Sequence, residues 1–359
     1  MSFEVKPSAI ANFGADMKAL STDTTTAKTY VQNHLDITAG DARMFFTAAG
    51  QVEQLRTTIL NTLTRLEQLG TACSTELANT ADMYRKADLA AIREMDRVMA
   101  RTEVTPEPPP ANPAAGLSEL PGARLTEPAP KDPIPKVADM FLSCADYISP
   151  SHWFLWAMGK VCGVNPAEWI AKELAGDWEK LSKAGAALEN LSEFHTVYAR
   201  ALDTEADKMF ASWKGNAADA CDAYFDDFEQ QVQTLVSPTR NAGSQCQSLA
   251  YGMWGMAKSI VSLLELLADE LLYIAVVAAA GAASSTFSAL IGPTIALGVI
   301  AWRISRAIKI WKQILVTHGA AWTAVTGFSG VIAGYMGGMN GMETQRLPGS
   351  GYDHPAVNA

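Results

Sequence analysis

The sequence is poor in charge and contains no recognisable catalytic motif. Charged residues make up 18% of its 359 residues, below the roughly 25% that globular chains usually carry. It has no HExxH or HxH spacing, no GxSxG elbow, no Walker loop and no GxGxxG after a strand. The histidines are scattered over the chain: His34, His152, His195, His318 and His354. We therefore expect no enzyme, no catalytic residue, no cofactor and no metal site.

Cysteine is scarce and irregularly spaced. An odd number of cysteines without a CxxC pair argues against a structural zinc site. The residues are Cys73, Cys144, Cys162, Cys221 and Cys246. Buried thiols are the favoured interpretation, and one or two disulfides remain the alternative if the protein works outside the cell. The N-terminus has no basic segment followed by an apolar one, so we expect no cleavable secretory signal, and any export uses another route.

Positive charge is also limited. The formal net charge is -10, which argues against nucleic acid as a partner because such binding neutralises phosphates with Lys and Arg. The acidic cluster of Asp226, Asp227 and Glu229 is expected to be a solvated helix face rather than a metal site. Hydrophobic residues make up 48% of the chain, which is enough for two or three packing units in a chain of this length.

Residues 1–101 have helical periodicity throughout. The apolar residues recur at intervals of three and four: Ile10, Phe13, Met17 and Leu20, then Val52, Leu55, Ile59, Leu63, Leu66 and Leu69. We expect one helix over residues 8–36, a turn at residues 37–41 and a second helix ending near Met99. Two long helices with a short connection predict an antiparallel hairpin. Because a lone hairpin exposes part of its apolar stripe, this one is expected to pack on another part of the chain.

The middle of the chain changes composition twice. Residues 102–136 contain ten of the 17 prolines, which predicts an extended, partly stiff linker. Residues 137–258 are expected to form aromatic-rich short helices and a second hairpin, whose two helices meet at Trp213 and Gly215. Glycine supplies the backbone freedom for the reversal. Pro238 and Gly243 predict a break or kink in the second of these helices.

Residues 259–342 form a hydrophobic helical region, followed by a polar tail, residues 343–359, that we expect to be disordered. Two uncharged runs, residues 271–302 and 313–342, flank a basic segment. Each run exceeds the roughly 20 residues that cross a bilayer as a helix. Transmembrane helices, with the basic segment on the cytoplasmic side, are one interpretation, and a buried helical hairpin is the other. The membrane-flanking basic residues would be Arg303, Arg306, Lys309 and Lys312.

Two short motifs point to a function. Tyr84 and Asp88 lie four residues apart and share one face of a helix. Their sequence, Tyr-Arg-Lys-Ala-Asp, resembles the YxxxD/E export signal of type VII (ESX) secretion substrates, and residues 1–100 resemble the EspC-type family. Trp213 and Gly215 begin a stretch that resembles the WxG turn and following alanines of the WXG and PPE families.

This resemblance implies an all-α fold, with two long antiparallel helical hairpins forming a bundle. The hydrophobic C-terminal helical region is similar to that of EspA- and EspE-like substrates. In PE–PPE pairs and EspB-like proteins, the Tyr/Asp and Trp/Gly elements lie together at one end of a bundle, which the secretion apparatus reads. The order of the two elements here is the EspB-like order. The longer linker leaves open whether the two halves dock within one chain or each with a separate partner.

We therefore expect a substrate of a type VII secretion system, exported folded and acting as an interaction or membrane-active protein. It would be secreted or at the cell surface, and its partners would be the secretion ATPase or a chaperone. A helical partner, a homo-oligomer and a membrane are further possible partners. The alternative function is an integral membrane component or assembly factor of such a system, kept in the cell envelope. A third is the leader or translocation part of a toxin.

Overall fold

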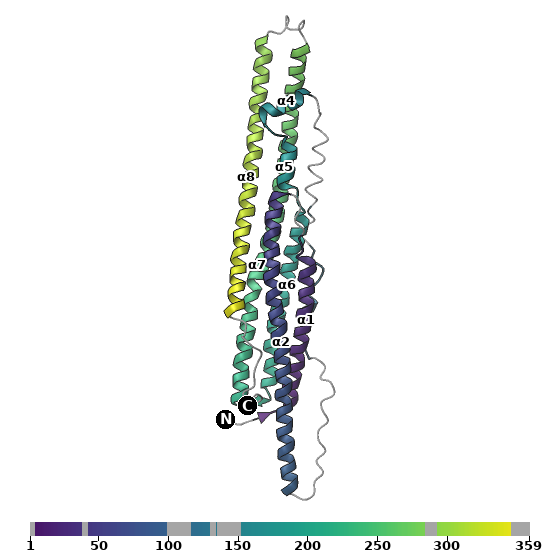
Figure 1. Cartoon of the computed structure of the whole chain (residues 1–359), viewed down its shortest axis with the longest axis vertical. Coiled ribbons are helices and arrows are strands. Elements are labelled where there is room, and N and C mark those ends of the chain that lie inside the picture. The colour runs from purple at the N-terminus through teal and green to yellow at the C-terminus, as the bar shows by residue number, and fades with distance from the viewer. Residues whose placement is uncertain are drawn as a thin grey trace.

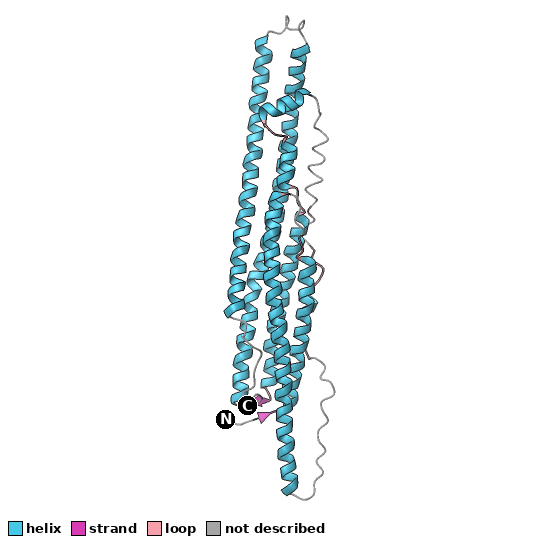
Figure 2. Ribbon diagram, in the orientation of Figure 1, coloured by secondary structure: helices cyan, strands magenta, loops and turns pink. Residues whose placement is uncertain are grey.

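The computed structural model describes residues 4–37, 42–98, 116–129, 134, 152–283 and 293–345. These residues form an elongated bundle of helices that lie side by side (Figure 1), and the expected all-α fold is confirmed. The long helices are α1 (Pro7–His34), α2 (Arg43–Val98), α6 (Trp178–Phe210), α7 (Asn216–Ala283) and α8 (Pro293–Gln345). The short elements are α4 (His152–Val161), α5 (Pro166–Leu174), the 3-10 helix η1 (Pro121–Arg124) and the strands β1 (Glu4–Val5) and β2 (Trp213–Lys214). Figure 2 shows how little of the described chain is strand.

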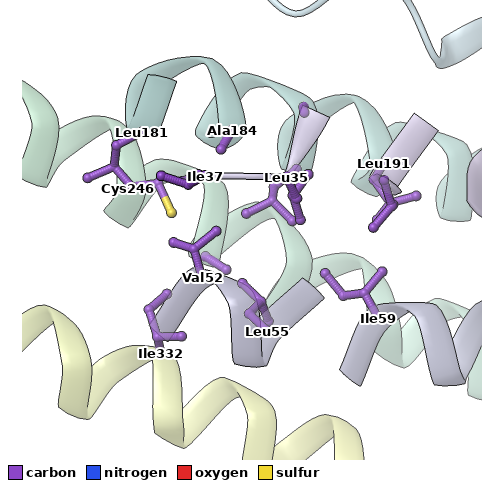
Figure 3. Packing of buried hydrophobic residues seen from close by; sticks show 14 of the residues in the cluster. Leu35, Ile37, Val52, Leu55, Ile59, Leu181, Ala184, Leu191, Cys246 and Ile332 are labelled. Carbon is purple, nitrogen blue, oxygen red and sulfur yellow. The ribbon is translucent and has the colours of Figure 1, made fainter. Parts of the chain in front are cut away.

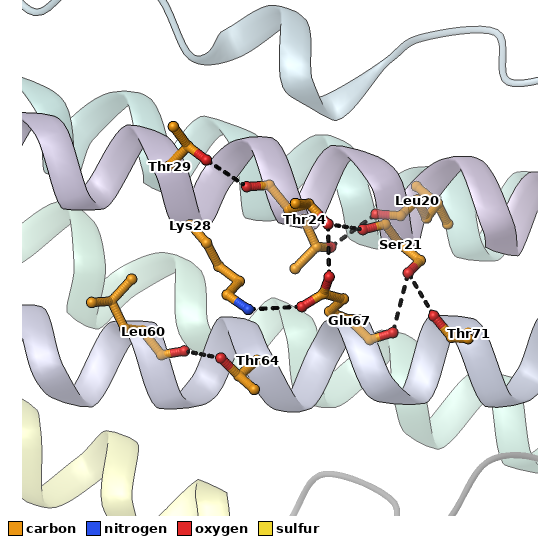
Figure 4. A network of polar contacts seen from close by, with 10 residues as sticks. Leu20, Ser21, Thr24, Lys28, Thr29, Leu60, Thr64, Glu67 and Thr71 are labelled. Carbon is orange, nitrogen blue, oxygen red and sulfur yellow. Dashed lines mark hydrogen bonds and ion pairs between the residues drawn. The ribbon is translucent and has the colours of Figure 1, made fainter.

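Helices α1 and α2 pack along each other as the apolar spacing predicts. Pro7 occupies the first turn of α1, where its missing N–H costs no hydrogen bond. A polar network on one side links the two helices (Figure 4). Lys28 of α1 lies 2.8 Å from the Glu67 carboxylate of α2, and the Ser21 and Thr71 hydroxyls are 2.8 Å apart. The apolar stripe and this network together fix the register of the pair.

Helices α6 and α7 approach each other closely at two glycines. A Cβ atom added to Gly185 of α6 would lie 2.6 Å from the Gly243 carbonyl oxygen of α7, and the reverse holds for Gly243. The two backbones therefore touch where side chains would hold them apart. The break expected at Pro238 and Gly243 is absent, because α7 continues through Pro238. Leu235 and Ala242, on either side of the proline, are both buried in the core.

One continuous core joins the long helices. Figure 3 shows apolar side chains of α2, α6, α7 and α8 together with Leu35 and Ile37, which directly follow α1. Helix α8 contributes buried residues at helical spacing: Ile314, Ala321, Val325, Phe328 and Ile332. This arrangement makes α8 part of the bundle along the segment that follows the basic residues.

The basic segment lies within α8. Arg303 and Arg306 each approach the buried Glu270 carboxylate of α7, at 3.0 Å, and the Arg303 guanidinium lies 4.1 Å from the Tyr273 ring centroid. Lys309 and Lys312 lie on the exposed side of α8. Among the described residues, no helix has both the length and the hydropathy of a membrane-spanning segment.

A second buried carboxylate attaches the other half of α8. Glu173 of α5 accepts a hydrogen bond from the Trp322 indole N–H of α8 at 3.2 Å, and Arg43 of α2 lies 3.2 Å from it. His318 lies 3.5 Å from the same carboxylate and packs against the Trp169 ring. Polar contacts therefore connect α8 to α5 and α7, and Glu173 also connects α5 to α2.

Part of the proline-rich linker is docked on the bundle. The Gly116 N–H donates to Asp16 at 2.7 Å and the Gly122 N–H donates to Asp23 at 2.8 Å. The Thr126 carbonyl accepts from the Tyr30 hydroxyl of α1 at 2.9 Å and from the Asn190 amide of α6 at 3.0 Å. Residues 116–129 thus connect α1 to α6. The other linker residues, apart from residue 134, lie outside the described residues.

The remaining predictions concern the cysteines, a domain boundary, the acidic cluster and the C-terminal tail. Cys73, Cys162, Cys221 and Cys246 are thiols, while Cys144 lies outside the described residues. The boundary placed between residues 258 and 259 falls inside α7. Asp226 and Asp227 are exposed on α7, and Glu229 is half-buried. Helix α8 ends at Gln345, and the rest of the tail lies outside the described residues.

Candidate recognition site

The two short motifs meet at one end of the bundle. Helix α2 carries Tyr84, and the reversal between α6 and α7, here called the Trp213 turn (residues 211–215), lies beside it near β1 (Figure 1). The Tyr84 and Trp213 ring centroids are 6.1 Å apart and the planes are inclined at 74°, which is an edge-to-face contact. In this structure the two halves dock within one chain.

The Trp213 turn is defined by how one helix ends and the next begins. After α6, the Ala211 N–H donates to the Asp207 carbonyl at 2.9 Å and the Ser212 N–H to the Met209 carbonyl at 3.1 Å. Gly215 has a φ of 127°, a conformation that disfavours any residue with a side chain. Its carbonyl accepts the Asp219 N–H at 3.0 Å and so begins α7. The motif's glycine is therefore required by the geometry of the reversal.

Trp213 is the anchor of this turn. Its side chain is 1% exposed, and its ring stacks on Phe210, with 6.1 Å between centroids and 19° between planes. Tyr84 covers it from α2 and is itself half-buried. Burial raises the pKa of the Tyr84 hydroxyl, and the adjacent Trp213 indole opposes part of that rise. Tyr84 therefore presents a neutral ring and hydroxyl at neutral pH.

Asp88 lies one turn further along α2 and is exposed. Within the same motif, Arg85 pairs with Asp82 at 2.8 Å, so the Arg85 charge is directed back along the helix. Lys86 is exposed on the helix surface. The site thus combines a half-buried aromatic ring with an exposed carboxylate on one helix. Beyond this point the α2 backbone extends past the end of the other helices (Figure 1).

The proposed site residues fall into two groups. Tyr84, Trp213 and Gly215 come together, with Asp88 adjacent, whereas the four basic residues of α8 belong to a different part of the bundle. Acidic groups surround the start of α7. The pKa of Asp222 is raised by partial burial and by the nearby Asp226, Asp207 and Asp219 carboxylates. Four carboxylates therefore lie near one another around the start of α7, and the Lys214 charge opposes part of their effect.

Sequence reasoning missed the third component of this end, strand β1. β1 pairs antiparallel with β2, with Glu4 opposite Lys214 and Val5 opposite Trp213. The available signal was Pro7, because a residue that precedes proline is biased towards an extended conformation. Lys6 follows that bias, with φ -110° and ψ 101°. A two-residue strand has too few positions to show an alternating pattern.

Comparisons with known proteins add no relative. No family model, no curated protein and no solved structure matches this chain. Within the described part of the chain, no group of three His, Cys, Asp or Glu side chains is placed to hold a metal ion. The site thus consists of the aromatic contact between Tyr84 and Trp213 beside the exposed carboxylate of Asp88.

Proposed function

We propose that this chain is a substrate of a type VII (ESX-like) secretion system, recognised where Tyr84 meets the Trp213 turn. The observation that carries the proposal is the edge-to-face contact between Tyr84 and Trp213. Each motif alone is short enough to occur often by chance. Their contact at one end of a helical bundle is the arrangement that the resemblance to EspB-like proteins implies.

The burial of Trp213 supports export in the folded state. Tyr84 on α2 and Trp213 in the turn between α6 and α7 lie far apart in the chain, so the site exists only after the two helix pairs have packed together. Asp88, exposed beside the aromatic contact, supplies the charged group that a partner reads. The partner would be the secretion ATPase or a chaperone. The protein would then be secreted or held at the cell surface without a signal peptide.

Exposed apolar residues support a role in interaction or membrane activity after export. They lie on α7 and α8 at some distance from the Trp213 turn: Leu272, Tyr273, Val276, Trp302 and Val316. A helical partner, a second copy of the chain or a membrane surface would cover such residues. In this proposal, recognition for export and the later activity use different parts of the bundle.

A secretion assay in an actinobacterial host with a type VII system tests the proposal. We expect Tyr84→Ala, Asp88→Ala and Trp213→Ala to disappear from the medium and to accumulate in the cells. Lys86→Ala, at an exposed position of the same motif, is the matched control and should be exported like the parent. Circular dichroism of each purified variant checks that the bundle has folded, which matters most for Trp213→Ala.

The same cultures distinguish the alternative functions. Normal export of both Tyr84→Ala and Asp88→Ala would refute the recognition site. If the parent is absent from the medium and stays in the membrane fraction after carbonate extraction, the envelope component is favoured instead. Fractionation of medium, cytoplasm and membrane from one culture therefore gives all the required results.

A further inference from the structure

Strand β1 places a segment outside both motifs in direct contact with the candidate site. Its two residues pair with Trp213 and Lys214, and the next N–H, that of Lys6, donates to the Ser212 carbonyl at 3.0 Å. We propose that β1 and Lys6 are positioning elements of the recognition site and hold the Trp213 turn in the conformation that the partner reads. This inference rests on the proposed function.

The backbone of the turn needs such a partner. Regular helical hydrogen bonds stop after the Ser212 N–H and resume when the Gly215 carbonyl accepts the Asp219 N–H. Between these points the chain is extended, and a buried or half-buried backbone group must find a hydrogen-bond partner outside its own helix. β1 provides that partner on the side of Trp213 and Lys214.

Val5 connects the strand pair to the core. Residues directly opposite each other in an antiparallel pair have side chains on the same face. Val5 stands opposite Trp213, is half-buried and packs against the hydrophobic core, while Lys6 is exposed. The strand therefore fixes the backbone of Trp213 while Phe210 and Tyr84 pack against its ring.

The candidate site is therefore assembled from three segments that are distant in the sequence: β1, the helical turn of α2 that carries Tyr84, and the Trp213 turn. Loss of β1 leaves both motifs intact in sequence. It releases the backbone of the turn and removes the half-buried Val5 side chain from the edge of the core. Export would then depend on the docking of the N-terminal strand as well as on the two motifs.

Lys6→Pro and Lys6→Ala form the test pair. Lys6→Pro removes the N–H that donates to Ser212, whereas Lys6→Ala keeps it and changes only an exposed side chain. Val5→Gly is a second variant that keeps every backbone donor and removes the side chain opposite Trp213. Hydrogen exchange of purified protein over residues 212–215 measures the turn, circular dichroism measures folding, and the secretion assay measures export.

We expect Lys6→Pro to exchange about 3- to 10-fold faster in the turn, the effect of one net hydrogen bond, with unchanged helix content and several-fold lower export. Lys6→Ala should match the parent in all three measurements, and Val5→Gly should change in the same direction as Lys6→Pro. Unchanged exchange in folded Lys6→Pro and Val5→Gly would overturn the inference. So would normal export despite faster exchange, provided that Tyr84→Ala is retained. If Tyr84→Ala and Asp88→Ala are both exported normally, the proposed function itself fails.

Discussion

His195 should make this bundle sensitive to acid. The imidazole is 2% exposed on α6, and in the described structure neither ring nitrogen has a hydrogen-bond partner. Burial lowers its pKa from 6.5 to about 4. Because the folded pKa lies below the unfolded one, the unfolded chain binds the proton first as pH falls. The stability associated with neutral His195 is therefore present above pH 6.5 and is lost as pH falls towards 4.

The size of the effect follows from the shift. Each pKa unit corresponds to about 1.4 kcal/mol, so between pH 7 and pH 4 the parent should lose about 3 kcal/mol through this one residue. His195→Leu removes the titration and also removes a buried polar group without a partner. At pH 7 the variant should be about 1 kcal/mol more stable than the parent, and at pH 4 the advantage should grow to about 4 kcal/mol.

Urea unfolding followed by circular dichroism at pH 7 and pH 4 measures both values. Both pH values lie away from the sequence pI of about 5.1, the pH at which the protein would be least soluble. Other groups change the absolute stability in both proteins, so the difference between parent and variant is the informative quantity. If that difference is the same at both pH values, His195 does not titrate as its burial requires and the reasoning is refuted.

Three further variants test other parts of the packing. Gly185→Ala should lower the free energy of unfolding by about 1–3 kcal/mol because its Cβ would lie 2.6 Å from the Gly243 carbonyl oxygen; Gly252→Ala, whose Cβ meets nothing within 4 Å, should stabilise α7 and is the control. Asp16→Asn should show the opposite pH dependence to His195→Leu: its stability relative to the parent should rise as pH rises. Burial raises the Asp16 pKa to about 6, so stability from this residue is present at low pH and is lost as pH rises through 6, and the variant should be about 1–2 kcal/mol more stable at pH 7. Glu270→Gln should lower the free energy of unfolding by about 2–3 kcal/mol, since it leaves Arg303 and Arg306 without their buried carboxylate. Glu265→Gln, at an exposed position, is the control and should leave the free energy of unfolding unchanged.

Helix boundaries were the most predictable part of this fold. The first helix was expected over residues 8–36 and runs over Pro7–His34, and the second is described from Arg43 to Val98, where the described residues stop. Long apolar stripes and a first-turn proline are local signals, and a helix is a local structure. The ends of the first helix could therefore be predicted from the sequence.

Glycine and proline in α7 were harder to interpret because each has more than one structural use. Together, Pro238 and Gly243 predict a break or kink. In the bundle Gly243 allows the α7 backbone to touch α6 at Gly185. A glycine that allows a close approach and a glycine that ends a helix look the same in one sequence. Only the partner helix, which is distant in the chain, distinguishes them.

Only part of the candidate site follows from the local geometry of the two motifs. Tyr84 and Asp88 share a helical face, and Gly215 permits a reversal, and both statements follow from local geometry. The contact between Tyr84 and Trp213 and the pairing of β1 with β2 depend on how distant segments pack, so neither has a local signal. A short motif that is weak alone becomes a specific surface only when the fold brings its counterpart to it. The export variants should therefore be compared with folded controls, because a general loss of packing would remove the same surface.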